Sequence, residues 1–296
     1  GSPVSQSLFQ GQRLNDHYIT PRRFPHVLWQ YPRLIRRLRG NRYDLAVDVS
    51  CSQSGAGAFI VGVSGSRIRA GMAGKWDRLF NLKVAKLRER NKYAKLAALL
   101  AALDLEEIDR VGALEFSATE RIQALTRLND ITGKSLAKTV GICVGGRKLR
   151  GKRWPLENFA EVISRLQERG VGVVTFLGPE EKDLVETLPK SLPSVPVVLE
   201  PSLRKFAAIV AHLDLLICAD SGPMHLACAV DVPVLAVFQP RNLKRWAPPA
   251  HAARSLSHPD GVSADMVVAA ALEMLSVERS PDDSPAPRVS SARPGI

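Results

Sequence analysis

The residues best suited to bind a charged ligand lie in a short segment that follows an apolar run. Residues 220–225 read Asp-Ser-Gly-Pro-Met-His and come directly after the apolar run 215–219. In α/β folds, ligands bind at the carboxyl ends of the strands, where loops lead into helix N-termini. We therefore predict that a helix begins here and that the free N–H groups of Gly222, Met224 and His225 face a phosphate, which the helix dipole also attracts.

The residue types in this segment suit such a helix start. Ser221 or Asp220 can cap the helix, and Pro223 is favoured in a first helical turn. Gly222 lets the backbone approach a ligand because it has no side chain. A plain capped helix without a ligand is the alternative interpretation of the same pattern.

A second candidate segment, residues 145–155, combines glycines with basic residues. It reads Gly-Gly-Arg-Lys-Leu-Arg-Gly-Lys-Arg-Trp-Pro, follows the apolar run 139–144, and has five basic residues among eleven. Such a loop can bring cations to a diphosphate, although it lacks the glycine spacing and the Ser or Thr of a P-loop. Trp154 would anchor the loop against the sheet. Solvated loop charges without a ligand are the alternative.

A third turn, Gly-Pro-Glu-Glu at residues 178–181, follows the apolar run 171–177. Its carboxylates could hydrogen-bond ribose hydroxyls, or they could be first-turn acids that complement a helix dipole. All three segments follow strands of one predicted sheet, so they can converge on one ligand.

Strands alternate with helices through the second half of the chain. This order implies βαβ units and a parallel sheet with helices on both faces, which is a Rossmann-like domain. The expected strands are 139–144, 171–177, 197–199, 215–219 and 233–238, and the expected helices are 156–166, 180–188, 203–213 and 223–230.

The first half shows fewer strands. A basic amphipathic helix is expected at 33–40, a strand at 43–49, a second possible strand at Ile68, and a helix at 93–105. These are too few strands for a complete doubly wound domain.

Three parts of the chain are therefore expected. They are a shortened N-terminal domain at residues 1–136, a ligand-binding domain at 137–276, and a disordered tail at 277–296, where Arg, Ser, Pro and Asp predominate.

The net charge of +12 is concentrated near the front of the 296-residue chain. Residues 13–42 contain eight Arg against one Asp, and residues 67–95 contain ten basic residues against two acidic ones. The positive electrostatic field of these two segments suggests an anionic partner such as a phosphorylated glycolipid, a membrane surface or nucleic acid. A merely solubilising surface is the alternative.

Cysteine usage and hydropathy limit the classes of protein to which this chain can belong. The four cysteines have no metal-binding spacing and read as buried free thiols in a reducing cytoplasm, so no metal site is expected. No apolar run approaches the ~20 residues that span a bilayer, and the first residues do not resemble a signal peptide.

Several short motifs together resemble glycosyltransferase family 9, which includes the ADP-heptose:lipopolysaccharide heptosyltransferases. In the second half they are residues 152–155 (Lys-Arg-Trp-Pro), 220–227, Val232-Pro233 and Gln239-Pro240. In the first half, residues 42–48 (Arg-Tyr-Asp-Leu-Ala-Val-Asp) resemble a strand of that family's N-terminal domain.

The resemblance implies a GT-B fold of two Rossmann-like domains, the N-terminal one incomplete here. The N-terminal domain would hold the acceptor and the C-terminal domain the nucleotide sugar. The implied reaction is inverting transfer of a heptose from ADP-heptose to a lipopolysaccharide core acceptor, without metal or cofactor. It also implies a cytoplasmic enzyme, with possible peripheral contact at an anionic membrane.

Site residues follow from the same resemblance. Lys152 and the backbone of 221–225 would bind the donor diphosphate, Asp220 would lie near the transferred sugar, and Glu180 would bind ribose.

The resemblance is weakest where the family carries its general base. The family normally opens with a strand, a glycine-rich turn with an Asp, and a helix. Here only residues 15–21 echo that turn, so Asp16 is the candidate base. Residues 50–52 (Ser-Cys-Ser) also replace the family's Gln-Gly.

Two other functions stay open. One is a catalytically lapsed protein that binds a nucleotide sugar without turnover. The other is a nucleic-acid-binding module, which the low aromatic content of 6% and the lack of a motif disfavour.

Overall fold

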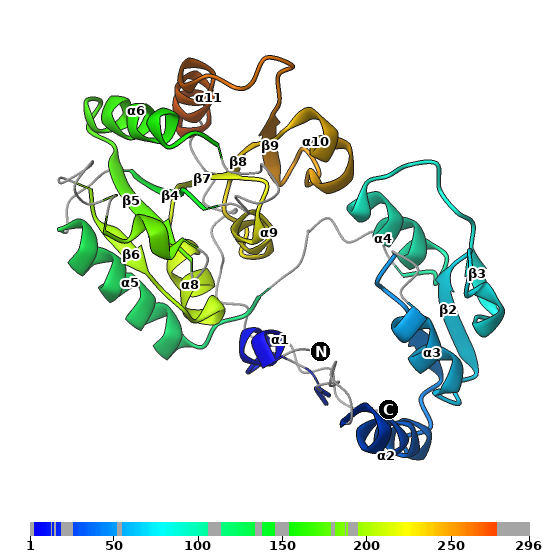
Figure 1. The fold of residues 1–296 in the computed structure, drawn as a ribbon. Helices are drawn as coiled ribbons and strands as arrows, with labels where there is room; N and C mark the ends of the chain where they lie inside the picture. The colour runs from blue at the N-terminus through cyan, green and yellow to red at the C-terminus, as the bar shows by residue number, and fades with distance from the viewer. Residues whose placement is uncertain are drawn as a thin grey trace.

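The computed structural model describes residues 3–12, 14, 16–18, 26–51, 55–105, 114–133, 138–145, 154–178, 181–186, 188 and 195–276. Two separate parallel sheets organise these residues, one in each half of the chain (Figure 1). Lys152, Glu180, most of the loop 145–155 and the tail 277–296 lie outside the described residues.

The first sheet has three parallel strands in the order β1-β2-β3. Helices cover both of its faces: α3 packs against β2 on one side, around Ala58, Val61 and Phe80, and α4 contributes Leu99 to a separate core on the other. The strands are β1 (Leu45–Val47), β2 (Ile68–Met72) and β3 (Leu82–Val84), and the helices are α2 (His26–Gly40), α3 (Gly55–Val63), the 3-10 helix η1 (Asp77–Leu79) and α4 (Lys92–Ala101).

The second sheet has six parallel strands in the order β6-β5-β4-β7-β8-β9. Along the chain this is the order 3-2-1-4-5-6 of a dinucleotide-binding sheet, and it reverses between β4 and β7. The strands are β4 (Thr139–Cys143), β5 (Gly172–Leu177), β6 (Val197–Leu199), β7 (Leu215–Ala219), β8 (Val234–Val237) and β9 (Ala253–Leu256).

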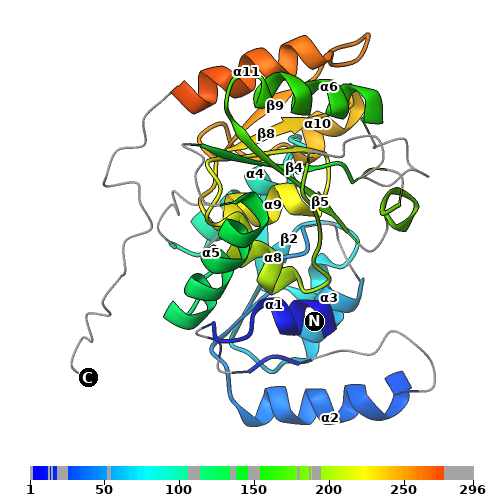
Figure 2. The same ribbon diagram turned by 90° about the vertical axis from the view of Figure 1, so that its left-hand side faces the viewer.

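Two buried cores fill the two faces of this sheet. Helices α6 and α11 lie side by side on one face, and α5, α8 and α9 cover the other (Figures 1 and 2). The helices are α5 (Ala118–Thr132), α6 (Leu156–Gln167), α8 (Leu203–Val210), α9 (Gly222–Ala229), α10 (Pro240–Trp246) and α11 (Ala264–Ser276).

The apolar runs of the second half form the predicted strands. All five expected strands are present within about two residues of their predicted ends. The continuous helix expected at 180–188 is wrong: residues Lys182–Leu184 form the 3-10 helix η3, a turn follows at 185–186, and Leu188 is helical. The 3-10 turn follows from Glu181, whose side chain folds back to the end of β5 and whose carbonyl accepts the Leu184 N–H at 2.9 Å.

Two segments that precede residue 137 pack with the second half of the chain. Helix α5 packs against β5 and α8, and α1 (Pro3–Leu8) packs against α8. Phe116 and Leu128 belong to a core of the second sheet. Residues 114–133 therefore pack with the second half through buried apolar side chains, and α1 packs there through its contact with α8.

The cysteines lie in the core, as expected. All four cysteines are free and buried. No helix in the described part of the chain has the length and apolar character needed to cross a membrane.

Candidate functional site

Two of the three predicted segments meet where the strand order of the second sheet reverses. Strands β4 and β7 are direct neighbours, with Cys143 opposite Cys218 near their carboxyl ends. Gly145 follows β4 and Asp220 follows β7, so both lie at the same edge of the sheet. This edge is where open α/β sheets bind ligands.

The first turn of α9 is open to a ligand. Ser221 is the N-cap residue, and Pro223 lies in the first turn as predicted. The Ser221 hydroxyl donates to the Ala219 carbonyl at 3.0 Å and makes no capping bond, which corrects the expected cap. A Cβ atom at Gly222 would meet no heavy atom within 4 Å, so the backbone there borders open space.

The free backbone donors are fewer than the sequence predicts. The carbonyl of an N-cap residue accepts the first intrahelical hydrogen bond, from the residue four positions later. That residue is His225, so its N–H is used inside the helix. Gly222 is exposed, so its N–H can face a ligand, whereas Pro223 has no N–H and Met224 is fully buried.

Asp220 lies buried at the carboxyl end of β7. Its side chain and backbone are only 6% exposed, and its N–H extends the ladder to β8 by donating to the Val237 carbonyl at 3.2 Å. The carboxylate is therefore held next to the start of α9.

Glu181 is a buried carboxylate that the sequence did not single out from its neighbour Glu180. Its Oε2 accepts the Gly178 N–H at 2.9 Å, and a Cβ at Gly145 would lie 2.8 Å from its carboxyl carbon. Glu181 thus connects the ends of β4 and β5, and the two glycines make room for it. The sequence signal that could have identified Glu181 is an acidic residue close to the glycine turns that end two neighbouring strands.

Trp154 anchors the end of the basic loop, as predicted. Its indole Nε1 donates to the Val262 carbonyl at 2.9 Å, and its ring packs edge-on against Phe159 with centroids 4.8 Å apart. The flank of the loop is therefore fixed against the second sheet.

A seam between the two halves lies beside α9. The hydroxyl of Tyr93, on α4, contacts Nδ1 of His225 at 2.5 Å. Asn91 Nδ2 donates to the Ala247 carbonyl at 2.9 Å, and the ring of Trp246 lies 6.3 Å from that of His225. Sequence analysis missed this contact because it joins residues far apart in the chain.

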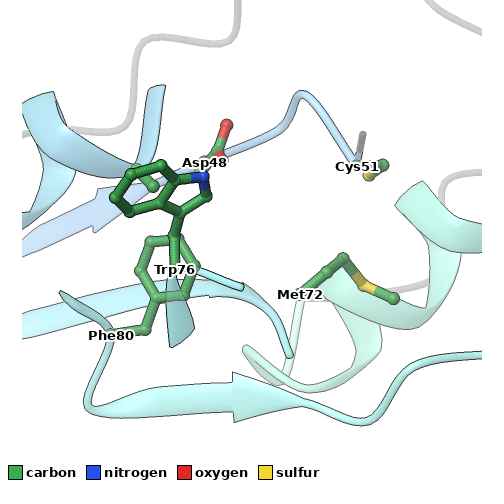
Figure 3. A pocket seen from close by; sticks show the side chains of 6 residues that line it. Asp48, Cys51, Met72, Trp76 and Phe80 are labelled. Carbon is green, nitrogen blue, oxygen red and sulfur yellow. The ribbon is translucent and has the colours of Figure 1, made fainter. Parts of the chain in front are cut away.

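The first sheet has a small pocket at the carboxyl ends of β1 and β2. Figure 3 shows Asp48 beside Trp76, with Cys51 and Met72 across the pocket. Asp48 is 8% exposed, and its Oδ1 accepts the Ser50 N–H at 3.0 Å. It is the buried carboxylate nearest to the carboxyl ends of this sheet among the described residues.

Asp16 lies away from the other predicted site residues. Its carboxylate accepts hydrogen bonds from Tyr18 at 2.9 Å and from Arg37 at 3.0 Å, and the residue is exposed. Arg37 is in the last turn of α2, which leads into the amino end of β1. The structure therefore does not bring Asp16 together with the other predicted site residues.

These features can be compared with known proteins. The model of glycosyltransferase family 9 (heptosyltransferase) matches residues 31–274. The chain belongs to glycosyltransferase family 9. Its match to this family includes both sheets and the whole candidate site.

Curated relatives of this family-9 chain include heptosyltransferases. It is 25% identical over 226 residues to lipopolysaccharide heptosyltransferase 3 of Escherichia coli, which covers 73% of this chain and 65% of that protein. Over 102 residues it is 33% identical to lipopolysaccharide heptosyltransferase 3 of E. coli K12, covering 33% of this chain and 30% of that protein. The chain thus spans less than two thirds of the length of these relatives.

Solved structures of family 9 share the fold. A family-9 glycosyltransferase from Veillonella parvula superposes with a TM-score of 0.73 at 21% identity, covering 91% of this chain and 85% of that one. E. coli ADP-heptose lipopolysaccharide heptosyltransferase II superposes with a TM-score of 0.63 at 22% identity. The match covers 92% of this chain and 94% of that one. The predicted GT-B fold of parallel α/β sheets is confirmed.

Proposed function

We propose that the chain is a heptosyltransferase that moves a heptose from ADP-heptose to a lipopolysaccharide core acceptor. The observation that carries this proposal is the open first turn of α9 at the point where the strand order reverses. The exposed N–H of Gly222 and the positive end of the helix dipole suit a diphosphate. A solved relative of the same fold, E. coli heptosyltransferase WaaC, is described with ADP.

The proposed reaction inverts the anomeric carbon. An acceptor oxygen bonds to that carbon from one face, the bond to the diphosphate oxygen breaks on the other, and the acceptor proton passes to a carboxylate. Negative charge develops on the departing ADP, and Lys152 and the Gly222 N–H would stabilise it. Glu180 stays a proposed ribose ligand, and Asp220 a proposed neighbour of the transferred sugar.

Two carboxylates are candidates for the base. Asp16 is proposed from the family resemblance, but Arg37 and Tyr18 already engage it. Asp48 is buried at the carboxyl end of β1, on the side where the first half would present an acceptor. We favour Asp48 on this geometry.

A lapsed nucleotide-sugar-binding protein is the second candidate. Asp16 lies away from the other predicted site residues and pairs with Arg37, which favours this candidate if Asp48 does not act as the base. Transfer of radiolabelled sugar from any ADP-, UDP- or GDP-sugar by the purified chain would exclude this candidate.

Contact with an anionic membrane is proposed for α2. This helix makes few contacts with other described elements (Figure 2) and exposes Arg33 and Arg36, while Leu34 and Ile35 are half-buried. Basic amphipathic helices bind anionic bilayers in this way. Co-sedimentation should occur with phosphatidylglycerol vesicles and not with phosphatidylcholine vesicles. It should weaken when both arginines are replaced by Gln.

The donor proposal is tested by calorimetric titration with ADP, UDP, GDP and CDP. Selective ADP binding that weakens in Lys152→Ala supports the ADP-sugar donor. Binding of another nucleotide would mean that the donor sugar carries that nucleotide in place of ADP. If the folded protein bound none of the four, the proposed donor site would be contradicted.

A further inference from the structure

The first turn of α4 is tied to the second half by a built contact. Asn91 caps this turn, because its Oδ1 accepts the N–H groups of Tyr93 at 2.8 Å and Ala94 at 3.2 Å. The same side chain donates through Nδ2 to the Ala247 carbonyl at 2.9 Å, just after α10. One residue therefore fixes both the start of α4 and its distance from α10.

This arrangement aims Tyr93 at α9. Its hydroxyl lies 2.5 Å from His225 Nδ1, and the two rings are tilted with centroids 5.7 Å apart. Trp246 packs against the same imidazole at 6.3 Å. His225 lies in the first turn of α9, three residues after the exposed Gly222.

One hydrogen bond joins the two side chains. Burial raises the pKa of Tyr93, so the phenol stays protonated at neutral pH. A protonated phenol can donate to Nδ1 or accept from Nδ1–H, and the tautomer of His225 decides which of the two occurs. In both arrangements the contact fixes the orientation of the imidazole ring.

We propose that Tyr93 is a positioning residue that acts through His225 to hold the acceptor-side half in register with the α9 turn. This inference rests on the proposed transferase function. The donor contacts of α9 all belong to the second half, so donor affinity does not need Tyr93. Sugar transfer does need it, because the acceptor and the anomeric carbon must meet within a fraction of an ångström.

Tyr93→Phe is the test, since Phe keeps the ring and removes only the hydroxyl. We expect kcat to fall by roughly 10- to 100-fold, with the Kd for ADP unchanged within about twofold. The matched control is Tyr43→Phe, whose hydroxyl accepts only from Asn41 within the first half and does not reach α9. The Tyr43→Phe control should keep the wild-type kcat and the wild-type Kd for ADP. A kcat for Tyr93→Phe equal to the control's would overturn the inference.

A spectroscopic readout is independent of activity. The ¹⁵N signal of the His225 Nδ1 atom should shift in Tyr93→Phe, because Nδ1 loses its hydrogen bond with the phenol. An identical spectrum in both proteins would overturn the contact. If the wild type transfers no sugar while this spectrum still changes, the proposed function fails and the positioning role with it, although the contact stands.

Discussion

Arg204 of α8 and Glu120 of α5 form a two-pronged ion pair. Arg204 Nε lies 2.5 Å from Oε1 of Glu120, and Nη2 lies 3.0 Å from Oε2. The same guanidinium donates to the carbonyls of Leu8 at 3.0 Å and Glu115 at 2.9 Å. One nearly buried cation therefore holds α1, α5 and α8 together on the second sheet.

Replacing Glu120 by Gln should destabilise the second half by about 2 kcal/mol, the value typical of hydrogen bonds to charged groups. The change leaves Arg204 buried without its counter-charge. Urea unfolding followed by circular dichroism measures the effect. Glu161→Gln is the matched control, because Glu161 pairs with Arg165 on an exposed helix face. It should cost under ~0.5 kcal/mol, and an equal loss in both variants would contradict the role of Arg204.

The same pair predicts how stability depends on pH. The Arg204 guanidinium, with a smaller contribution from Ser117, holds the pKa of Glu120 at about 2. A carboxyl with a depressed folded pKa stabilises the protein fully above its unfolded pKa of about 4.3 and loses that contribution as pH falls towards the folded value. The stability difference between wild type and Glu120→Gln should therefore shrink from pH 5 to pH 2. A constant difference across that range would be inconsistent with the pair.

Gly222→Ala should separate binding from folding. A Cβ at this position meets no protein atom within 4 Å, so the thermal midpoint should change little. The same methyl group would narrow the approach to the exposed N–H at the start of α9, and we expect the Kd for ADP to rise about tenfold or more. Gly40→Ala, at the end of α2, also meets no atom and is the control for ADP binding. Unchanged ADP affinity in Gly222→Ala would exclude α9 as the diphosphate site.

Asp48→Asn and Asp16→Asn should distinguish the two candidate bases. If Asp48 takes the acceptor proton, its Asn variant should lower kcat by about 10²- to 10⁴-fold, the usual share of general base catalysis. Asp16→Asn should then act mainly by weakening the pair with Arg37. Sugar-transfer rates at saturating donor measure both. The opposite ranking would restore Asp16 as the base.

The apolar strands and the loops that follow them could be predicted from the sequence. The central strands β4, β5 and β7 are buried on both faces, so they appear as uninterrupted apolar runs. The edge strand β9 (Ala-Arg-Ser-Leu) and the strand β3 (Leu-Lys-Val) have no such run and were missed. Their pairing depends on the neighbouring strand more than on their own residues.

The side-chain relationships at the site were decided by the tertiary structure. Glu181 reaches the glycine turn after β4, and Tyr93 meets His225 across the two halves, 132 residues apart in the chain. Local patterns report which face of an element is apolar, and they placed the 220–225 turn at a strand end. They carry no information on which distant side chain comes within hydrogen-bonding distance, because that depends on how the packed helices and sheets orient one another.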